Sequence, residues 1–152
     1  MQSGAAIWKR LEEKFTEISP DSILAADVEA LRGCGLSRPK VRYAHCLAEA
    51  IAGGGLALDE LRVLSDEAAI CALTSVVGVG RWTAEVYLMF ALARPDVWPA
   101  GDIALAASAQ RLLELEQRPD QARLREIAER WRPWRTTAAL VLWRFYKRVP
   151  LG

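Results

Sequence analysis

The stretch Leu73-Thr74-Ser75-Val76-Val77-Gly78-Val79-Gly80-Arg81-Trp82-Thr83-Ala84 decides the fold. It places two glycines between two segments of helical character, and glycine tolerates positive φ and lets another backbone come close. With no side chains at Gly78 and Gly80, the amides of the turn and of the next helix can point outward together, where the helix dipole favours an anion such as a phosphate. We therefore expect two helices joined by a tight turn over about residues 66–93, although a purely structural turn would also fit this short motif.

The rest of the chain also has helical patterns, and no alternating apolar stretch bounded by hairpin turns occurs. Apolar stripes of period 3.6 recur from end to end, with cap and stop signals between them. The pattern predicts an all-α protein, a compact orthogonal helical bundle. The expected helices cover residues 5–18, 27–31, 37–52, 66–73, 81–93, 102–113, 120–132 and 134–147, and their expected N-caps are Asp27, Ser37, Ser65, Asp102 and Asp120.

Length and composition predict a single domain over residues 1–152. The hydrophobic fraction of 52% is enough to build a core. No apolar run is long enough to span a membrane, and the first residues lack the basic and apolar parts of a secretion signal, so we expect a cytoplasmic monomer. The net charge of +1, from 20 Lys and Arg against 19 Asp and Glu, is not that of a nucleic-acid-binding protein as a whole.

Basic residues are nevertheless concentrated in the last third of the chain, where they outnumber the acids around them. A locally basic face is one interpretation, and a solvated helix surface is the other. The residues are Arg123, Arg125, Arg130, Arg132, Arg135, Arg144, Lys147 and Arg148.

Cysteine and histidine, two of the residue types that bind metals, are few: the chain has three and one, respectively. Cys34, Cys46 and Cys71 are an odd number without Cys-x-x-Cys spacing, which argues against a disulfide framework and against an iron–sulfur cluster. His45 is the only histidine, so we expect a partly buried helix residue there and no metal site.

Three segments together resemble the helix-hairpin-helix (HhH-GPD) base-excision DNA glycosylases, and among them the bacterial DNA-3-methyladenine glycosylase II type. A weaker similarity runs from residue 31 to residue 50, including Gly35-Leu36-Ser37 and Lys40. The three segments are Val77-Gly78-Val79-Gly80-Arg81-Trp82-Thr83-Ala84, Val97-Trp98-Pro99-Ala100-Gly101-Asp102 and Ala128-Glu129-Arg130-Trp131-Arg132-Pro133-Trp134-Arg135.

The resemblance implies an enzyme that grips double-stranded DNA containing damaged bases through its backbone. Amides around Gly78, Val79, Gly80 and Thr83 would hold a DNA phosphate, a contact that positions a protein without reading sequence. A structural monovalent cation would face the backbone carbonyls of Thr74, Val76 and Val79. The resemblance implies no required cofactor.

The resemblance also assigns the chemistry to Asp102, which lies twenty-two residues after Gly80. Cleaving an N-glycosidic bond builds oxocarbenium character on the sugar, which a carboxylate can stabilise. Without the resemblance, a helix N-cap would be the usual role of such an aspartate, and the two roles can coexist.

Two of the six tryptophans, Trp82 and Trp143, match aromatic residues of the family's base pocket, where an electron-rich ring attracts a cationic alkylated base. Trp143 fits core packing equally well, and Trp131 and Trp134 fit it better. Trp82 also stands where bifunctional relatives place a lysine nucleophile, so we expect a monofunctional hydrolase without lyase activity.

A base must be flipped out of the duplex to reach such a pocket, and the family's wedge comes from a Gln-Gln-x-Ser-like stretch before the first helix. This chain begins at Met1-Gln2-Ser3, so we expect it to lack the wedge and one N-terminal helix. A non-catalytic helix-hairpin-helix DNA-binding fragment and a shortened gene product remain alternatives. The preferred lesion also stays open among 3-methyladenine, 7-methylguanine and deaminated purines.

Overall fold

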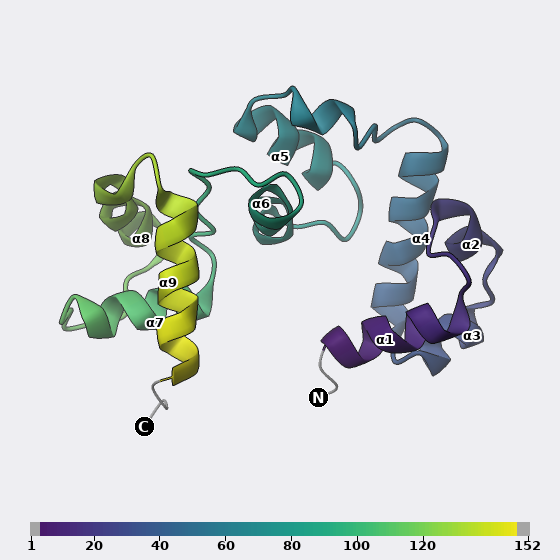
Figure 1. The fold of residues 1–152 in the computed structure, drawn as a ribbon, viewed down its shortest axis with the longest axis horizontal. Helices are drawn as coiled ribbons and strands as arrows, with labels where there is room; N and C mark the ends of the chain where they lie inside the picture. Colours follow the sequence, from purple (N-terminus) through teal and green to yellow (C-terminus); the bar gives the residue numbers. More distant parts are fainter. Residues whose placement is uncertain (1–3, 149–152) are drawn as a thin grey trace. The chain divides into compact units, whose positions relative to one another are not determined.

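The computed structural model describes residues 4–148, whose helices are drawn in Figure 1. These residues divide into two compact units, one ending at Val79 and the other beginning at Gly80. Every regular element in residues 4–148 is helical, which confirms the all-α prediction. None of their helices is long and apolar enough to cross a membrane. The expectation for Met1-Gln2-Ser3 lies outside the described residues.

The first unit is built around α4 (Arg38–Ala52), which packs against α2 (Pro20–Ala25) and α3 (Val28–Gly33). The unit also contains α1 (Gly4–Lys14), the short 3₁₀ helix η1 (Glu60–Arg62) and α5 (Asp66–Thr74). The core of its first half is a cluster in which one apolar face of each helix meets the others. Its buried members are Leu11, Leu31, Cys34 and Val41.

The second unit begins with α6 (Arg81–Phe90) and continues with α7 (Ile103–Leu112), α8 (Gln121–Ala128), η2 (Glu129–Trp131) and α9 (Arg135–Arg148). α9 packs along α7, and the two are also joined by a buried hydrogen bond from the Ser108 hydroxyl to the Leu142 carbonyl of 3.0 Å. Leu88, Leu105 and Leu124 are fully buried and come from three different helices.

Most of the predicted N-caps are confirmed, because each is a local contact that the sequence can encode. The side chains of Asp27, Ser65, Asp102 and Asp120 each accept a backbone N–H from the first turn of the helix that follows. Ser37 stands at the N-cap position of α4, but its side chain makes no capping hydrogen bond, so that part of the prediction is wrong.

Two predicted helices are shorter in the structure. The helix expected over residues 5–18 ends at Lys14, and a separate helix, α2, follows, capped reciprocally by Ser19 and Ser22. The bend lets Phe15 and Ile18 pack on the same core cluster. The helix expected to reach Ala93 ends at Phe90, and Ala93 has a φ of 53°. This left-handed conformation usually falls on a glycine, so an alanine there gives the sequence no mark of the helix end.

Candidate active site

The glycine turn follows α5 directly, and its tight part is closed by the Val79 N–H, which donates to the Val76 carbonyl at 3.0 Å. Gly78 has a φ of 95°, a conformation that side chains rarely tolerate. A Cβ at this position would also overlap the ring of Tyr43, which comes from α4. Gly78 is therefore required both by its backbone angle and by the aromatic ring that lies on it.

Gly80 has a different role, because its φ of −85° is open to any residue and no atom lies within 4 Å of the Cβ it lacks. It occupies the N-cap position of α6, and no side chain caps that helix end. The amides of the first turn of α6 therefore have no side-chain partner at the cap. Gly80 and Thr83 are both exposed there.

The loop that leads to Asp102 is fastened to the start of α9. Arg135 donates from Nε to Oδ1 of Asp96 at 2.8 Å and from Nη2 to Oδ2 at 3.0 Å, so the two side chains pair through both carboxylate oxygens. The Thr136 hydroxyl donates to the Arg94 carbonyl at 2.7 Å and accepts from the Val97 N–H at 3.1 Å. These bonds fix the chain from Arg94 to Val97, just before Asp102.

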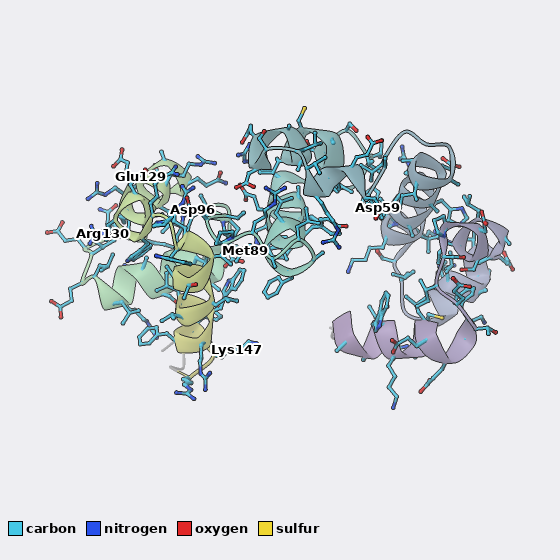
Figure 2. The ribbon with its side chains drawn as sticks, turned by 45° about the horizontal axis from the view of Figure 1, so that its top comes forward. Asp59, Met89, Asp96, Glu129, Arg130 and Lys147 are labelled. Carbon is cyan, nitrogen blue, oxygen red and sulfur yellow. The ribbon has the colours of Figure 1, made fainter. Side chains whose placement is uncertain are left out.

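The arginine side chains beside Asp96 and Glu129 favour the ionised form of these two carboxylates. Burial by itself would raise the pKa of Asp96, but hydrogen bonds and charge from Arg135, with a smaller contribution from Arg132, more than offset it and leave the pKa below its ordinary value. The hydrogen bond from Arg132 likewise lowers the pKa of Glu129, and the same bond raises the pKa of Arg132. Asp96 and Glu129 are labelled at one end of α9 in Figure 2, with Lys147 at the other.

Asp102 is held by two hydrogen bonds, one to each oxygen. Its Oδ1 accepts the Leu105 N–H at 2.9 Å, which is the helix cap, and its Oδ2 accepts the indole N–H of Trp82 at 2.9 Å. Each carboxylate oxygen has two lone pairs, so both retain an acceptor site. The predicted carboxylate and the predicted aromatic residue are therefore in direct contact, through a bond that sequence analysis did not anticipate.

Two adjoining hollows share Trp82, Asp102, Ala104 and Tyr146. One has a volume of about 460 Å³ and includes Gly101 and Ile103, and the other, of about 330 Å³, includes Trp143. The second is walled mainly by aromatic rings, because Phe90 stacks on Trp143 with ring centroids 6.0 Å apart and an interplanar angle of 17°. The structure thus places the predicted catalytic residue, Asp102, and the two predicted pocket residues, Trp82 and Trp143, at one cavity, called here the Asp102 cavity.

Among the other lining residues that sequence analysis missed, three have aromatic or charged side chains: Phe90, Tyr146 and Lys147. The available signal was the register of α9, because Trp143, Tyr146 and Lys147 are three and four residues apart and so share one helical face. Phe90 is 62% exposed although it is a large apolar residue. Such exposure is typical of a binding surface and not of a core.

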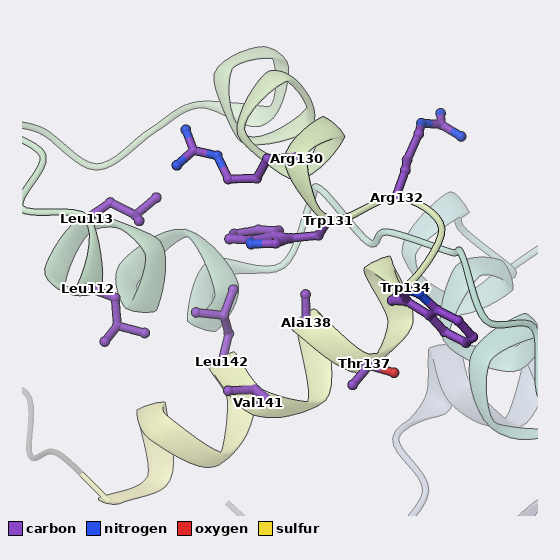
Figure 3. A pocket seen from close by; sticks show the side chains of 10 residues that line it. All are labelled: Leu112, Leu113, Arg130, Trp131, Arg132, Trp134, Thr137, Ala138, Val141 and Leu142. Atoms are coloured by element: carbon purple, nitrogen blue, oxygen red, sulfur yellow. The ribbon is translucent and has the colours of Figure 1, made fainter.

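A separate apolar hollow of about 490 Å³ lies between α7, η2 and α9 and shares no lining residue with the Asp102 cavity (Figure 3). Trp131 reaches into it above Ala138 and Leu142, and also packs against Trp98 with ring centroids 5.3 Å apart. Trp134 lines the edge of this hollow and is 63% exposed, so its predicted place in the core is wrong.

Within residues 4–148, no group of three or more His, Cys, Asp and Glu side chains is arranged to hold a metal ion. Cys34 is buried, Cys46 is half-buried and Cys71 is exposed, and all three are free thiols. His45 is half-buried on α4, as expected, and its Nε2 has no hydrogen-bond partner among these residues.

The comparison with protein families decides the identity, since the model of the HhH-GPD superfamily base excision DNA repair proteins matches residues 1–133. The chain belongs to this HhH-GPD superfamily. The match includes the glycine turn, the loop before Asp102 and η2.

Relatives of this HhH-GPD protein include two from Schizosaccharomyces pombe. The alkylbase DNA glycosidase-like protein mag2 is 34% identical over 130 residues, and DNA-3-methyladenine glycosylase 1 is 36% identical over 130 residues. Each alignment covers 85% of this chain but only 61% and 57%, respectively, of the relative. The chain thus spans little more than half the length of these curated relatives.

The solved structure of the Schizosaccharomyces pombe 3-methyladenine DNA glycosylase Mag1, in complex with abasic DNA, has the same fold. It superimposes with a TM-score of 0.91 at 33% identity, covering 100% of this chain and 77% of that one. The predicted helix-hairpin-helix fold of this HhH-GPD protein is therefore confirmed.

Proposed function

We propose that this chain is a monofunctional DNA glycosylase that hydrolyses the N-glycosidic bond of alkylated bases such as 3-methyladenine. The observation that supports it best is the cavity at Asp102, where one carboxylate faces four aromatic side chains in a member of a base-excision family. The four aromatic residues are Trp82, Phe90, Trp143 and Tyr146.

Asp102 supplies the charge that the reaction needs. As the base departs, positive charge develops on the sugar, and a carboxylate fixed in advance stabilises that charge without reorganising. The hydrogen bonds from Leu105 and Trp82 fix it, and each leaves a lone pair free. Trp82 is thus a positioning residue as well as a wall of the pocket.

The aromatic walls suit the leaving group. A base alkylated on a ring nitrogen carries a positive charge, and the faces of electron-rich rings attract cations. The stacked pair of Phe90 and Trp143 offers such a face beside Asp102. Because a cationic base leaves readily, a carboxylate and a fitting pocket suffice in this proposal, and no general acid is required.

DNA would be held by the glycine turn and by the first turn of α6. Gly78 keeps the turn narrow, and the amides from Gly80 to Thr83 follow a helix start that no side chain caps, where a phosphate is favoured. The carbonyls of Thr74, Val76 and Val79 are hard oxygen donors of the kind that cations such as Na⁺ or K⁺ accept. The Val76 carbonyl accepts a hydrogen bond from the Val79 N–H and retains one lone pair that a cation could use. The three carbonyls therefore suit the predicted monovalent cation, and its binding stays a prediction.

The decisive experiment is release of 3-methyladenine from methylated duplex DNA by Asp102→Asn. We expect a loss of at least about a hundredfold in rate, the size seen when one electrostatic group is removed, with DNA binding retained. Asp120→Asn is the matched control, because Asp120 is also an N-cap that accepts a backbone N–H, from Arg123 at 2.8 Å, but is absent from the cavity. Equal activity of the two variants would refute the role of Asp102.

Two other outcomes would replace the proposal. Binding of DNA without any base release by the wild-type chain would leave a non-catalytic helix-hairpin-helix module. Lys147 gives the cavity an amine, so borohydride trapping of a covalent complex, lost in Lys147→Met, would indicate a lyase and contradict the hydrolytic proposal.

A further inference from the structure

The strongest unpaired positive charge of the first unit lies on α4. From Ala30 to Ala48 the chain has no Asp or Glu, and Arg38, Lys40 and Arg42 follow each other at alternate positions. All three are exposed, and none has an ion-pair partner among residues 4–148.

Three of the basic residues of the last third differ in this respect, because they have ion-pair partners. Arg123 pairs with Glu126, and Arg132 and Arg135 both pair with Asp96. Three of the eight cations that suggested a basic face there are therefore committed to carboxylates. In the first unit, the largest group of cations without an ion pair among the described residues is on α4, a helix to which the sequence analysis assigned no basic face.

Geometry connects this helix to the glycine turn. The Tyr43 ring lies on Gly78, so the exposed side of α4 adjoins the turn directly. Lys40 precedes Tyr43 by three residues, which places the two side by side on the helix surface. Arg38 and Arg42 are four residues apart, a spacing at which like charges repel unless an anion lies between or above them.

We propose that Arg38 and Arg42, which share one side of α4, and Lys40 and Tyr43, which adjoin each other toward the other side, bind phosphates of the same DNA duplex that the glycine turn holds; these four exposed residues are called the α4 basic face. The inference rests on the proposed function and extends it, because it adds a second grip outside the cavity. Cations without protein partners release counterions from DNA when they bind phosphates, which produces a salt-dependent affinity without sequence preference. A protein that searches undamaged DNA needs contacts of that kind.

The test measures binding to a fluorescein-labelled duplex, undamaged or with one abasic site, by anisotropy over a range of salt concentrations. The slope of log K against log salt is negative, and each lost phosphate contact reduces its magnitude by about 0.9, so Lys40→Gln with Arg42→Gln should make the slope shallower by about 1.8. The same double change at Arg123 and Arg125 on α8 alters the net charge equally and should leave the slope as it was. Lys40→Arg with Arg42→Lys should retain the wild-type slope.

The failures are distinguishable. A wild-type chain that does not bind DNA would overturn the proposed function. A wild-type chain that binds with a normal salt slope, which Lys40→Gln with Arg42→Gln leaves unchanged, would overturn only the α4 basic face. If the slope became equally shallow in the α8 variant, the α4 basic face would also be overturned, because the change would then reflect the net charge of the chain and not particular contacts. Circular dichroism checks that the variants remain helical, as expected for exposed side chains.

Discussion

The pair between Arg135 and Asp96 should contribute more to the stability of the second unit than the exposed pair between Arg123 and Glu126 does. Its side chains are only 17% and 22% exposed, whereas those of Arg123 and Glu126 are 59% and 66% exposed. Removing one partner of a fully buried pair costs about 3–5 kcal/mol, and exposed pairs contribute under about 1 kcal/mol. For this partly exposed pair we expect Arg135→Gln to cost about 2 kcal/mol, roughly thirtyfold in the folding equilibrium.

Urea unfolding followed by tryptophan fluorescence measures this cost, because five of the six tryptophans lie in the second unit. Arg123→Gln is the control and should change the free energy of unfolding by less than about 0.5 kcal/mol. The double variant Asp96→Asn with Arg135→Gln completes a cycle whose coupling energy isolates the pair. Coupling below about 0.5 kcal/mol, or equal losses in the two arginine variants, would refute the reasoning.

The pH dependence of the same measurement has a definite sign. The pKa of Asp96 is lower in the folded chain than in the unfolded one. The stabilisation is therefore complete above the unfolded pKa of about 4 and is lost as the pH falls through the folded pKa. The difference in unfolding free energy between the wild type and Arg135→Gln should become smaller as the pH falls below about 4. A difference that grows as the pH falls would contradict a lowered pKa of Asp96 in the folded chain.

Three further predictions concern the turn, the carboxylate and a cap. Gly78→Ala should cost roughly 2 kcal/mol of unfolding free energy and weaken DNA binding, because φ is positive there and the new Cβ overlaps Tyr43. Gly80→Ala should change the unfolding free energy by less than about 0.5 kcal/mol. Equal urea midpoints for the two variants would show that glycine is not required at position 78 more than at position 80. Trp82→Phe keeps an aromatic ring but removes the bond to the carboxylate, so single-turnover base release should slow by about tenfold while DNA affinity is kept. Asp120→Ala should cost about 1 kcal/mol of unfolding free energy as a lost N-cap, and an unchanged urea midpoint would argue against that cap.

Sequence reasoning succeeded where a contact is local. Asp27, Ser65, Asp102 and Asp120 cap helices because an N-cap bond spans only two or three residues. It failed at α2, where a serine replaces the usual Glu or Gln of the capping box, and at the end of α6, where an alanine adopts the left-handed conformation without a glycine to mark it.

In the Asp102 cavity, too, some features could be predicted from the sequence and others could not. The resemblance assigned the catalytic role to Asp102 and the base pocket to Trp82 and Trp143, and the structure brings the three residues together at one cavity. Their detailed arrangement was not predictable, because the indole bond to the carboxylate joins residues twenty positions apart and the stack joins Phe90 to Trp143. Trp134 was expected in the core, but it is exposed, because exposure depends on which face of the chain the other helices cover.

By itself, then, the sequence determined the helical periodicity, four of the caps, the glycine turn and, through three motifs in order, the family. Only the tertiary structure decided which charges meet protein partners. Arg135 meets Asp96 across thirty-nine residues, while Arg38, Lys40 and Arg42 meet no acid in the described chain. Local periodicity specifies the face on which a side chain lies, but the partner it meets depends on how distant helices pack.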